Sequence, residues 1–74
     1  MRFDGTLKTW DDERGFGFIE PDQGGEAVFV HVKGFSRREG RPRVGQRLTF
    51  EVELDPRGKK RAKNVLALQA AKPG

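Results

Sequence analysis

Two phenylalanines, two residues apart, are the residues whose type and spacing most clearly suggest a chemistry. Arg14 is followed by Gly-Phe-Gly-Phe-Ile, so Phe16 and Phe18 would share one face of a strand. Further on, Val-Phe-Val-His repeats the alternation and sends Phe29 and His31 to the face opposite their valines. Because a small core needs only one face of each strand, rings gathered on the other face predict a platform on which unpaired bases stack.

The segment before the paired phenylalanines adds further candidate residues. Alternation over residues 3–10 turns Leu7 toward the core and sends Lys8 and Trp10 outward, which predicts that Trp10 joins the platform. The alternative for a lone tryptophan in a small domain is a core anchor. Lys8 and Arg14 flank the rings and could hold phosphates, with a plain solvated surface as the alternative interpretation.

Catalytic and metal chemistry find little support in the composition. The acidic run at residues 11–13 could suggest paired carboxylates, but neighbours in a turn point apart, and no partner histidine or nucleophile is evident. The chain has no cysteine and a single histidine, which excludes disulfides, thiolate metal sites and a zinc cluster of the usual spacing. The sequence therefore predicts no enzyme activity, no metal and no cofactor.

The net charge of +4 is distributed unevenly along the chain. Residues 1–30 carry three basic and seven acidic side chains, whereas residues 31–74 carry twelve basic and four acidic ones. The basic residues of the second half form two clusters, one of Lys33, Arg37, Arg38, Arg41, Arg43 and Arg47, the other of Arg57, Lys59, Lys60, Arg61 and Lys63. Such a density of positive charge attracts polyanions, although a solvated surface would show the same pattern.

Five short segments separated by breakers predict an all-β chain. Residues 21–25 and 55–58 have strong turn chemistry, and the glycines and proline of residues 33–45 leave no room for a helix of ordinary length. The predicted strands are residues 3–10, 16–20, 27–32, 47–54 and 62–68. Five strands without a central helix favour a closed barrel, which leaves no exposed sheet edge.

The alternation also predicts which side chains face the core of this barrel. In the fourth strand the inward residues are Leu48, Phe50, Val52 and Leu54. In the last strand two phases remain open, either Ala62, Asn64 and Leu66 or Val65 and Ala67. Glycines at positions 5, 15 and 17 would relieve crowding where the strands coil sharply.

A chain of 74 residues is one domain with a small core. Its first residues lack the apolar run of a signal peptide, and no window approaches the length of a membrane span. We therefore expect a protein of the cytoplasm that does not enter membranes.

With both aromatic motifs in place, the chain resembles the cold-shock domain, an oligonucleotide-binding (OB) barrel with two RNP-like motifs. The RRM also uses aromatic RNP motifs, but it has the shorter motif first and two helices across its sheet, and neither holds here. The segments that carry the resemblance are Gly5-Thr6-Leu7-Lys8, Arg14-Gly15-Phe16-Gly17-Phe18-Ile19, Val28-Phe29-Val30-His31, Gly45-Gln46, Phe50-Glu51 and Ala62-Lys63-Asn64-Val65. The resemblance implies a five-stranded antiparallel OB-fold barrel over residues 1–68, and we expect a flexible tail at 69–74.

The resemblance further implies binding of single-stranded RNA or DNA by a cold-shock protein that acts as an RNA chaperone, and we expect a monomer. The predicted nucleic-acid interface consists of Lys8, Trp10, Arg14, Phe16, Phe18, Phe29, His31 and Arg57. The four residues of the two aromatic strands match the family's stacking positions, Lys8 and Arg14 match its basic contacts, and Arg57 lies near another.

The chain departs from the family pattern at several stacking positions. The family has Trp-Phe where this chain has Thr9-Trp10, and Val32 replaces a phenylalanine that normally widens the platform. Ala27 stands where aspartate is common, and the usual loop aromatic has no clear counterpart unless Phe35 substitutes. We expect the chain to depend more on phosphate contacts, with weaker base preference and a steeper salt response.

Another class of function is open on the sequence alone. A protein-interaction barrel could dock an acidic partner or a ribosomal surface with the same aromatic and basic residues, because small barrels host many functions. RNA and DNA are equally open as the ligand, since both offer bases to stack. A nuclease is disfavoured because its carboxylate and histidine cluster is missing.

Overall fold

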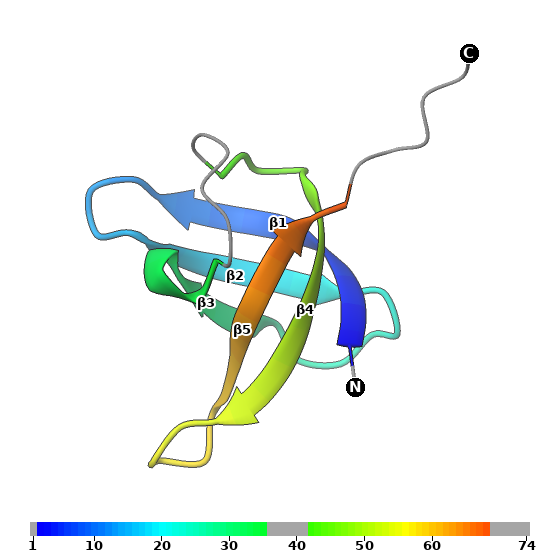
Figure 1. Cartoon of the computed structure of the whole chain (residues 1–74), viewed down its shortest axis with the longest axis vertical. Coiled ribbons are helices and arrows are strands. Elements are labelled where there is room, and N and C mark those ends of the chain that lie inside the picture. The colour runs from blue at the N-terminus through cyan, green and yellow to red at the C-terminus, as the bar shows by residue number, and fades with distance from the viewer. Residues whose placement is uncertain (1, 36–41, 69–74) are drawn as a thin grey trace.

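The structure is a computed structural model that describes residues 2–35 and 42–68, and these form a five-stranded barrel (Figure 1). The strands are β1 (Arg2–Asp11), β2 (Phe16–Pro21), β3 (Val28–His31), β4 (Arg47–Leu54) and β5 (Lys60–Ala67), and a 3-10 turn, η1 (Val32–Gly34), follows β3. Around the closed barrel their order is β1-β2-β3-β5-β4. The predicted all-β barrel is confirmed. The predicted tail at 69–74 lies outside the described residues, as do Arg37, Arg38 and Arg41.

One pairing of the barrel is parallel. The ladders that join β1 to β2, β2 to β3, β1 to β4 and β4 to β5 are antiparallel, whereas β3 lies parallel to β5 with Phe29 opposite Arg61. A fully antiparallel barrel was expected, and the parallel pair is the closure that joins the two ends of the sheet.

The core is built from apolar side chains of all five strands. Its fully buried members are Leu7, Ile19, Val28, Val30, Leu48, Phe50, Ala62 and Val65. Phe3 and Val52 are partly buried against this cluster, as predicted for Val52 by its place in the alternation. Leu54 was expected to face the core but is 66% exposed, because β4 extends beyond the end of the barrel there.

Several strand boundaries differ by one or two residues from those predicted. Val32 was placed in the third strand, but β3 ends at His31 and Val32 begins η1 instead. The last strand starts at Lys60, two residues earlier than predicted, because Lys60 pairs with Leu54 next to the hairpin turn. The turn itself is closed by backbone bonds between Asp55 and Lys59 and between Asp55 and Gly58.

A β-bulge at Lys8 changes the facing of β1. Leu7 pairs with Ile19 and Thr9 pairs with Phe18, so two steps along β1 match a single step along β2. The extra residue reverses the phase of the side chains beyond it. Thr9, which strict alternation with Leu7 would turn inward, is therefore exposed opposite Phe18. The prediction that Trp10 points outward with Lys8 is wrong, because Trp10 packs against the core.

A second bulge lies at Asn64 in β5. Thr49 pairs with Leu66 and Glu51 with Lys63, which leaves one extra residue on β5, and Asn64 has a φ of 50°. Asparagine tolerates this left-handed conformation better than most residues. Neither predicted phase of the strand holds throughout, since Ala62 and Val65 are both buried.

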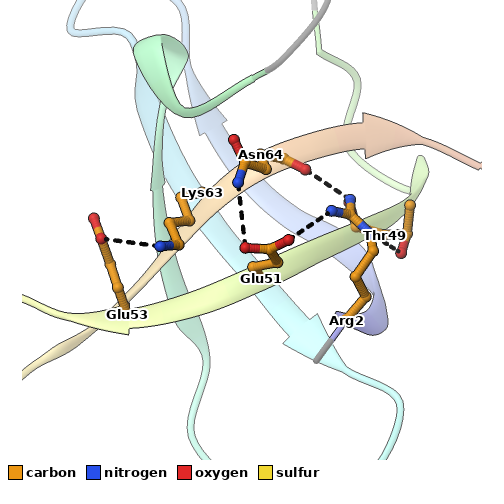
Figure 2. A network of polar contacts seen from close by, with 6 residues as sticks. All are labelled: Arg2, Thr49, Glu51, Glu53, Lys63 and Asn64. Carbon is orange, nitrogen blue, oxygen red and sulfur yellow. Dashed lines mark hydrogen bonds and ion pairs between the residues drawn. The ribbon is translucent and has the colours of Figure 1, made fainter.

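Arg2 holds the second bulge in place (Figure 2). Its Nη2 donates to the backbone oxygens of Asn64, at 2.6 Å, and of Thr49, at 3.0 Å. Glu51 accepts from the side chain of Asn64 at 3.2 Å and lies 3.4 Å from Nη1 of Arg2. One guanidinium thus connects β1, β4 and β5 where the ladder is irregular.

Candidate nucleic-acid interface

Three phenylalanine rings lie together on the outer face of β2 and β3. Phe18 pairs with Phe29, and their ring centroids are 5.9 Å apart in an edge-on arrangement. Phe16 lies 5.5 Å from Phe29 at an angle of 35°. Phe18 is 40% exposed, and Phe16 and Phe29 are half-buried. We refer to these three rings and His31, the pairing partner of Phe16, as the aromatic platform.

The inner face of the same strands explains why the rings point outward. Ile19, Val28 and Val30 are buried in the core and alternate with the platform residues. Gly17 lies between Phe16 and Phe18, and a Cβ added there would approach the backbone oxygen of Thr9. The space inside the barrel is thus already filled, and the rings lie on the outside, as the alternation predicted.

His31 is oriented by the turn that follows it. Its Nδ1 accepts a hydrogen bond from the backbone N–H of Lys33 at 3.1 Å and caps η1. When Nδ1 is the acceptor in a neutral imidazole, the proton resides on Nε2. The ring therefore combines a flat surface beside Phe16 with a hydrogen-bond donor at its far edge.

Trp10 lies on the core side of the sheet, apart from the platform. It pairs with Gly17, packs on the core cluster and meets Phe35 edge-on with centroids 5.8 Å apart. Its Nε1–H donates to Asp12 Oδ1 at 2.9 Å. Trp10 therefore helps to close one end of the barrel, and Phe35 is its packing partner.

The predicted basic contacts come from three different parts of the fold. Lys8 is exposed in the β1 bulge, with its Nζ 3.6 Å from Glu20. Arg14 is exposed in the turn before Phe16, which Asp11 organises by accepting from the backbone N–H groups of residues 13 and 14. Arg57 is exposed at the tip of the β4–β5 hairpin, which reaches beyond the rest of the barrel in Figure 1.

Two residues that the sequence did not assign to the interface also adjoin the platform. Arg61 was only one member of a basic cluster, but the parallel pairing sets it opposite Phe29. Thr9 lies opposite Phe18 on the outer face, with a small side chain beside the exposed ring. Thr9 stands where the family pattern has a ring, so its position was open to prediction. Nothing local in the sequence indicates that Arg61 lies beside Phe29.

An ion pair and turn hydrogen bonds lower the pKa of two carboxyl groups. Arg47 donates to both oxygens of Asp22 and lowers the pKa of this group, linking the start of β4 to the β2–β3 loop. In the β4–β5 turn, the backbone N–H groups of Lys59 and Arg57 donate to Oδ1 of Asp55 and lower its pKa. Both groups favour the folded state in their charged form.

We expect the free energy of unfolding to decrease as the pH falls below about 4, the ordinary range of aspartate. Because the folded-state pKa values of Asp22 and Asp55 lie below the unfolded ones, their stabilisation is complete above the unfolded pKa and is lost as the pH falls through the folded one. Urea unfolding of wild type and of Asp22→Asn/Asp55→Asn, which keeps an oxygen acceptor at each position, measures this. As the pH falls, the free energy of unfolding of the double variant should decrease less than that of wild type. If both decrease equally, other carboxylates are responsible for the loss of stability in acid.

Other classes of site are not evident in the part of the chain that the structure describes. Among these residues, no group of three or more His, Asp and Glu side chains is placed to hold a metal ion. Over the same residues, no helix has the length and apolar character needed to cross a membrane. The aromatic platform and the basic residues near it remain the candidate site.

A small closed barrel with aromatic rings on the outer face of two adjacent strands defines a class of single-domain binding proteins, and comparison with known proteins specifies the family. The profile described as 'Cold-shock' DNA-binding domain matches residues 3–68. The chain therefore belongs to the cold-shock domain family, whose members bind nucleic acids, and it is a nucleic-acid-binding protein of that kind.

Individual relatives agree with this assignment. The chain is 46% identical over 66 residues to the cold shock-like protein CspA of Shewanella violacea, an alignment that covers 86% of this chain and 91% of the relative. It is 42% identical to the cold shock protein CspA of Rhizobium meliloti, with 85% and 94% covered. Glycine-rich protein 2 of Nicotiana sylvestris is 45% identical, but the match covers 88% of this chain and only 30% of that longer protein.

A solved structure has the same fold at low sequence identity. The structure described as drosophila Unr CSD456 superposes with a TM-score of 0.82 over all of this chain and 29% of that one, at 18% identity. This likeness confirms the barrel architecture predicted from the sequence.

Proposed function

We propose that this protein binds single-stranded RNA or DNA by stacking unpaired bases on the aromatic platform, and that it acts as an RNA chaperone of the cold-shock type. The observation that carries the proposal is the outward cluster of Phe16, Phe18 and Phe29, with ring centroids 5.5 and 5.9 Å apart. Bases can stack on such rings regardless of sequence, since every base has a π-face.

The geometry suits an unpaired strand better than a duplex. A base in a duplex is stacked on its neighbours, so its faces are not accessible to a protein ring unless the base is flipped out. A protein that captures bases only when they are unpaired lowers the free energy of the open strand and shifts the melting equilibrium by mass action. This mechanism needs neither ATP nor a catalytic group, and we propose that the protein is not an enzyme.

Basic side chains supply the remaining part of the proposed interface. Arg57 at the hairpin tip, with Lys8 and Arg14 near the rings, would contact the phosphates, and Trp10 would contribute only through its packing under β2. Thr9 leaves the place beside Phe18 without a ring, so a larger share of the affinity should come from phosphate contacts. We therefore expect the affinity to fall more steeply with salt concentration than in relatives with more aromatic residues. We propose that the protein works as a monomer in the cytoplasm.

Fluorescence anisotropy with a labelled single-stranded pyrimidine oligonucleotide tests the proposal. Titrations with RNA, with DNA and with the matching duplex, each at several salt concentrations, separate stacking from general charge attraction. We expect the single strands to bind and the duplex to bind much more weakly, with log affinity falling by about 0.7 per phosphate contact for each unit of log salt. Equal affinity for duplex and single strand would overturn the stacking mechanism, and no binding to any of them would favour a protein partner.

A further inference from the structure

Both carboxylate oxygens of Glu53 are engaged by cations from the neighbouring strand. Arg61 places Nε at 3.0 Å and Nη2 at 2.9 Å from Oε2 of Glu53. Lys63 places its Nζ 3.7 Å from Oε1 of the same residue, as Figure 2 shows. One glutamate of β4 thus pairs with two of the basic residues on β5 and offsets one of their two positive charges.

One of these two basic residues adjoins the aromatic platform. Arg61 lies opposite Phe29 in the parallel ladder, and Lys63, two residues further along β5, faces the same side of that strand as Arg61. All three side chains of the Glu53 cluster are partly exposed, between 35% and 45%. A strand bound on the platform would therefore run next to cations that are already paired within the protein.

We propose that Glu53 acts as a built-in competitor for nucleic-acid phosphate, holding Arg61 and Lys63 back from the bound strand and so limiting its affinity. This competition rests on the proposed function of the platform. A guanidinium pairs with phosphate and with carboxylate in the same geometry, so the two anions compete for one donor. Because an exposed ion pair is weak in water, this competition can reduce the affinity only a few-fold, and Asp55, whose pKa Arg61 also lowers, continues to attract Arg61 when Glu53 is replaced.

The β4–β5 hairpin shows the contrast within the same protein. Arg57, Lys59 and Lys60 are exposed there, and within the described ranges none of them forms a salt bridge. Arg57 lies near Asp55 and helps to lower the pKa of that group, but its side chain is not held in an ion pair as those of Arg61 and Lys63 are. The salt dependence of the wild-type protein would then come chiefly from the hairpin and less from β5.

Glu53→Gln tests the proposal, because it removes the charge and keeps the size of the side chain. We expect the affinity for a labelled single-stranded pyrimidine oligonucleotide to rise roughly two- to five-fold, the range for freeing an exposed charge. The slope of log affinity against log salt should steepen by about 0.7 for each phosphate newly contacted. Asp4→Asn is the matched control, since it changes the net charge equally from an exposed position on β1. It should leave the slope unchanged.

Arg61→Gln completes a double-mutant cycle. Alone it should change affinity less than two-fold, because Glu53 already occupies Arg61, but it should remove most of the gain from Glu53→Gln. The competition is refuted, and the proposed function stands, if wild type binds and Glu53→Gln binds no tighter. It is also refuted if Asp4→Asn gives the same gain. Absence of wild-type binding would overturn the proposed function itself, and the competition with it.

Discussion

Replacing Phe16 and Phe18 by alanine is expected to weaken binding of a single-stranded oligonucleotide by roughly 30-fold or more while the barrel remains folded. Stacking on an aromatic side chain contributes about 1–3 kcal/mol per base, and two of the three clustered rings would be lost. The barrel should survive, because neither side chain belongs to the buried core cluster. The cost to stability is the loss of the ring contacts with Phe29, about 0.5–1.5 kcal/mol for each pair.

Anisotropy titration gives the affinity of this double variant, and circular dichroism with urea unfolding gives its stability. Leu54→Ala is the matched control, since it truncates a 66% exposed apolar side chain that is in phase with the core residues Leu48 and Phe50. It should bind like wild type. A folded Phe16→Ala/Phe18→Ala variant with unchanged affinity would show that the rings are not the binding surface.

Local alternation was enough to predict the platform from the sequence. Gly-Phe-Gly-Phe and Val-Phe-Val-His each place glycine or valine on one face of the strand and a ring on the other. The small core has room for the glycine and valine side, so the rings face outward. Because β2 and β3 pair without a bulge, the period of two held along both strands. The prediction of Phe16, Phe18, Phe29 and His31 on a common face therefore needed no knowledge of tertiary contacts.

The bulges could not be predicted in this way. A single extra residue at Lys8 reverses the facing of Thr9 and Trp10, and no residue type near it indicates the change. At Asn64 a weak signal exists, since asparagine tolerates a positive φ, but the alternation left both phases of β5 open. The facing of a strand is set by its partners as well as by its own pattern.

The remaining gap concerns contacts between distant segments. Phe29 and Arg61 meet through a parallel pairing of strands that are far apart in the sequence, which no local pattern encodes. The ion pair between Arg61 and Glu53 crosses the β4–β5 hairpin, whereas in the sequence Arg61 stands out only as one charge of a basic cluster. Net charge predicted an affinity for polyanions, but it could not show which cations the protein itself already neutralises.

Gly17→Ala is expected to unfold the barrel or to destabilise it by about 3 kcal/mol, the upper end of the usual cost of overpacking, even though Gly17 lies between two platform rings. A Cβ at this position would clash with the backbone oxygen of Thr9 and come 2.9 Å from Cε3 of Trp10. The oxygen cannot retreat without separating β1 from β2 next to the Lys8 bulge. For a domain of this size, such a loss is a large part of the total stability.

Gly25→Ala is the matched control for the same change of residue. Gly25 has a φ of 95°, but nothing lies within 4 Å of the place that a Cβ would take, so alanine there meets only backbone strain of about 1–2 kcal/mol. Urea unfolding followed by the fluorescence of Trp10, which packs against the core, compares the two variants. If Gly17→Ala is as stable as Gly25→Ala but binds oligonucleotide poorly, the glycine serves access to the rings. If it unfolds, as we expect, the glycine is required because β1 and β2 approach closely at this position. The face of β2 that Gly17 occupies then has no room for a side chain, and the neighbouring rings are placed on the opposite face.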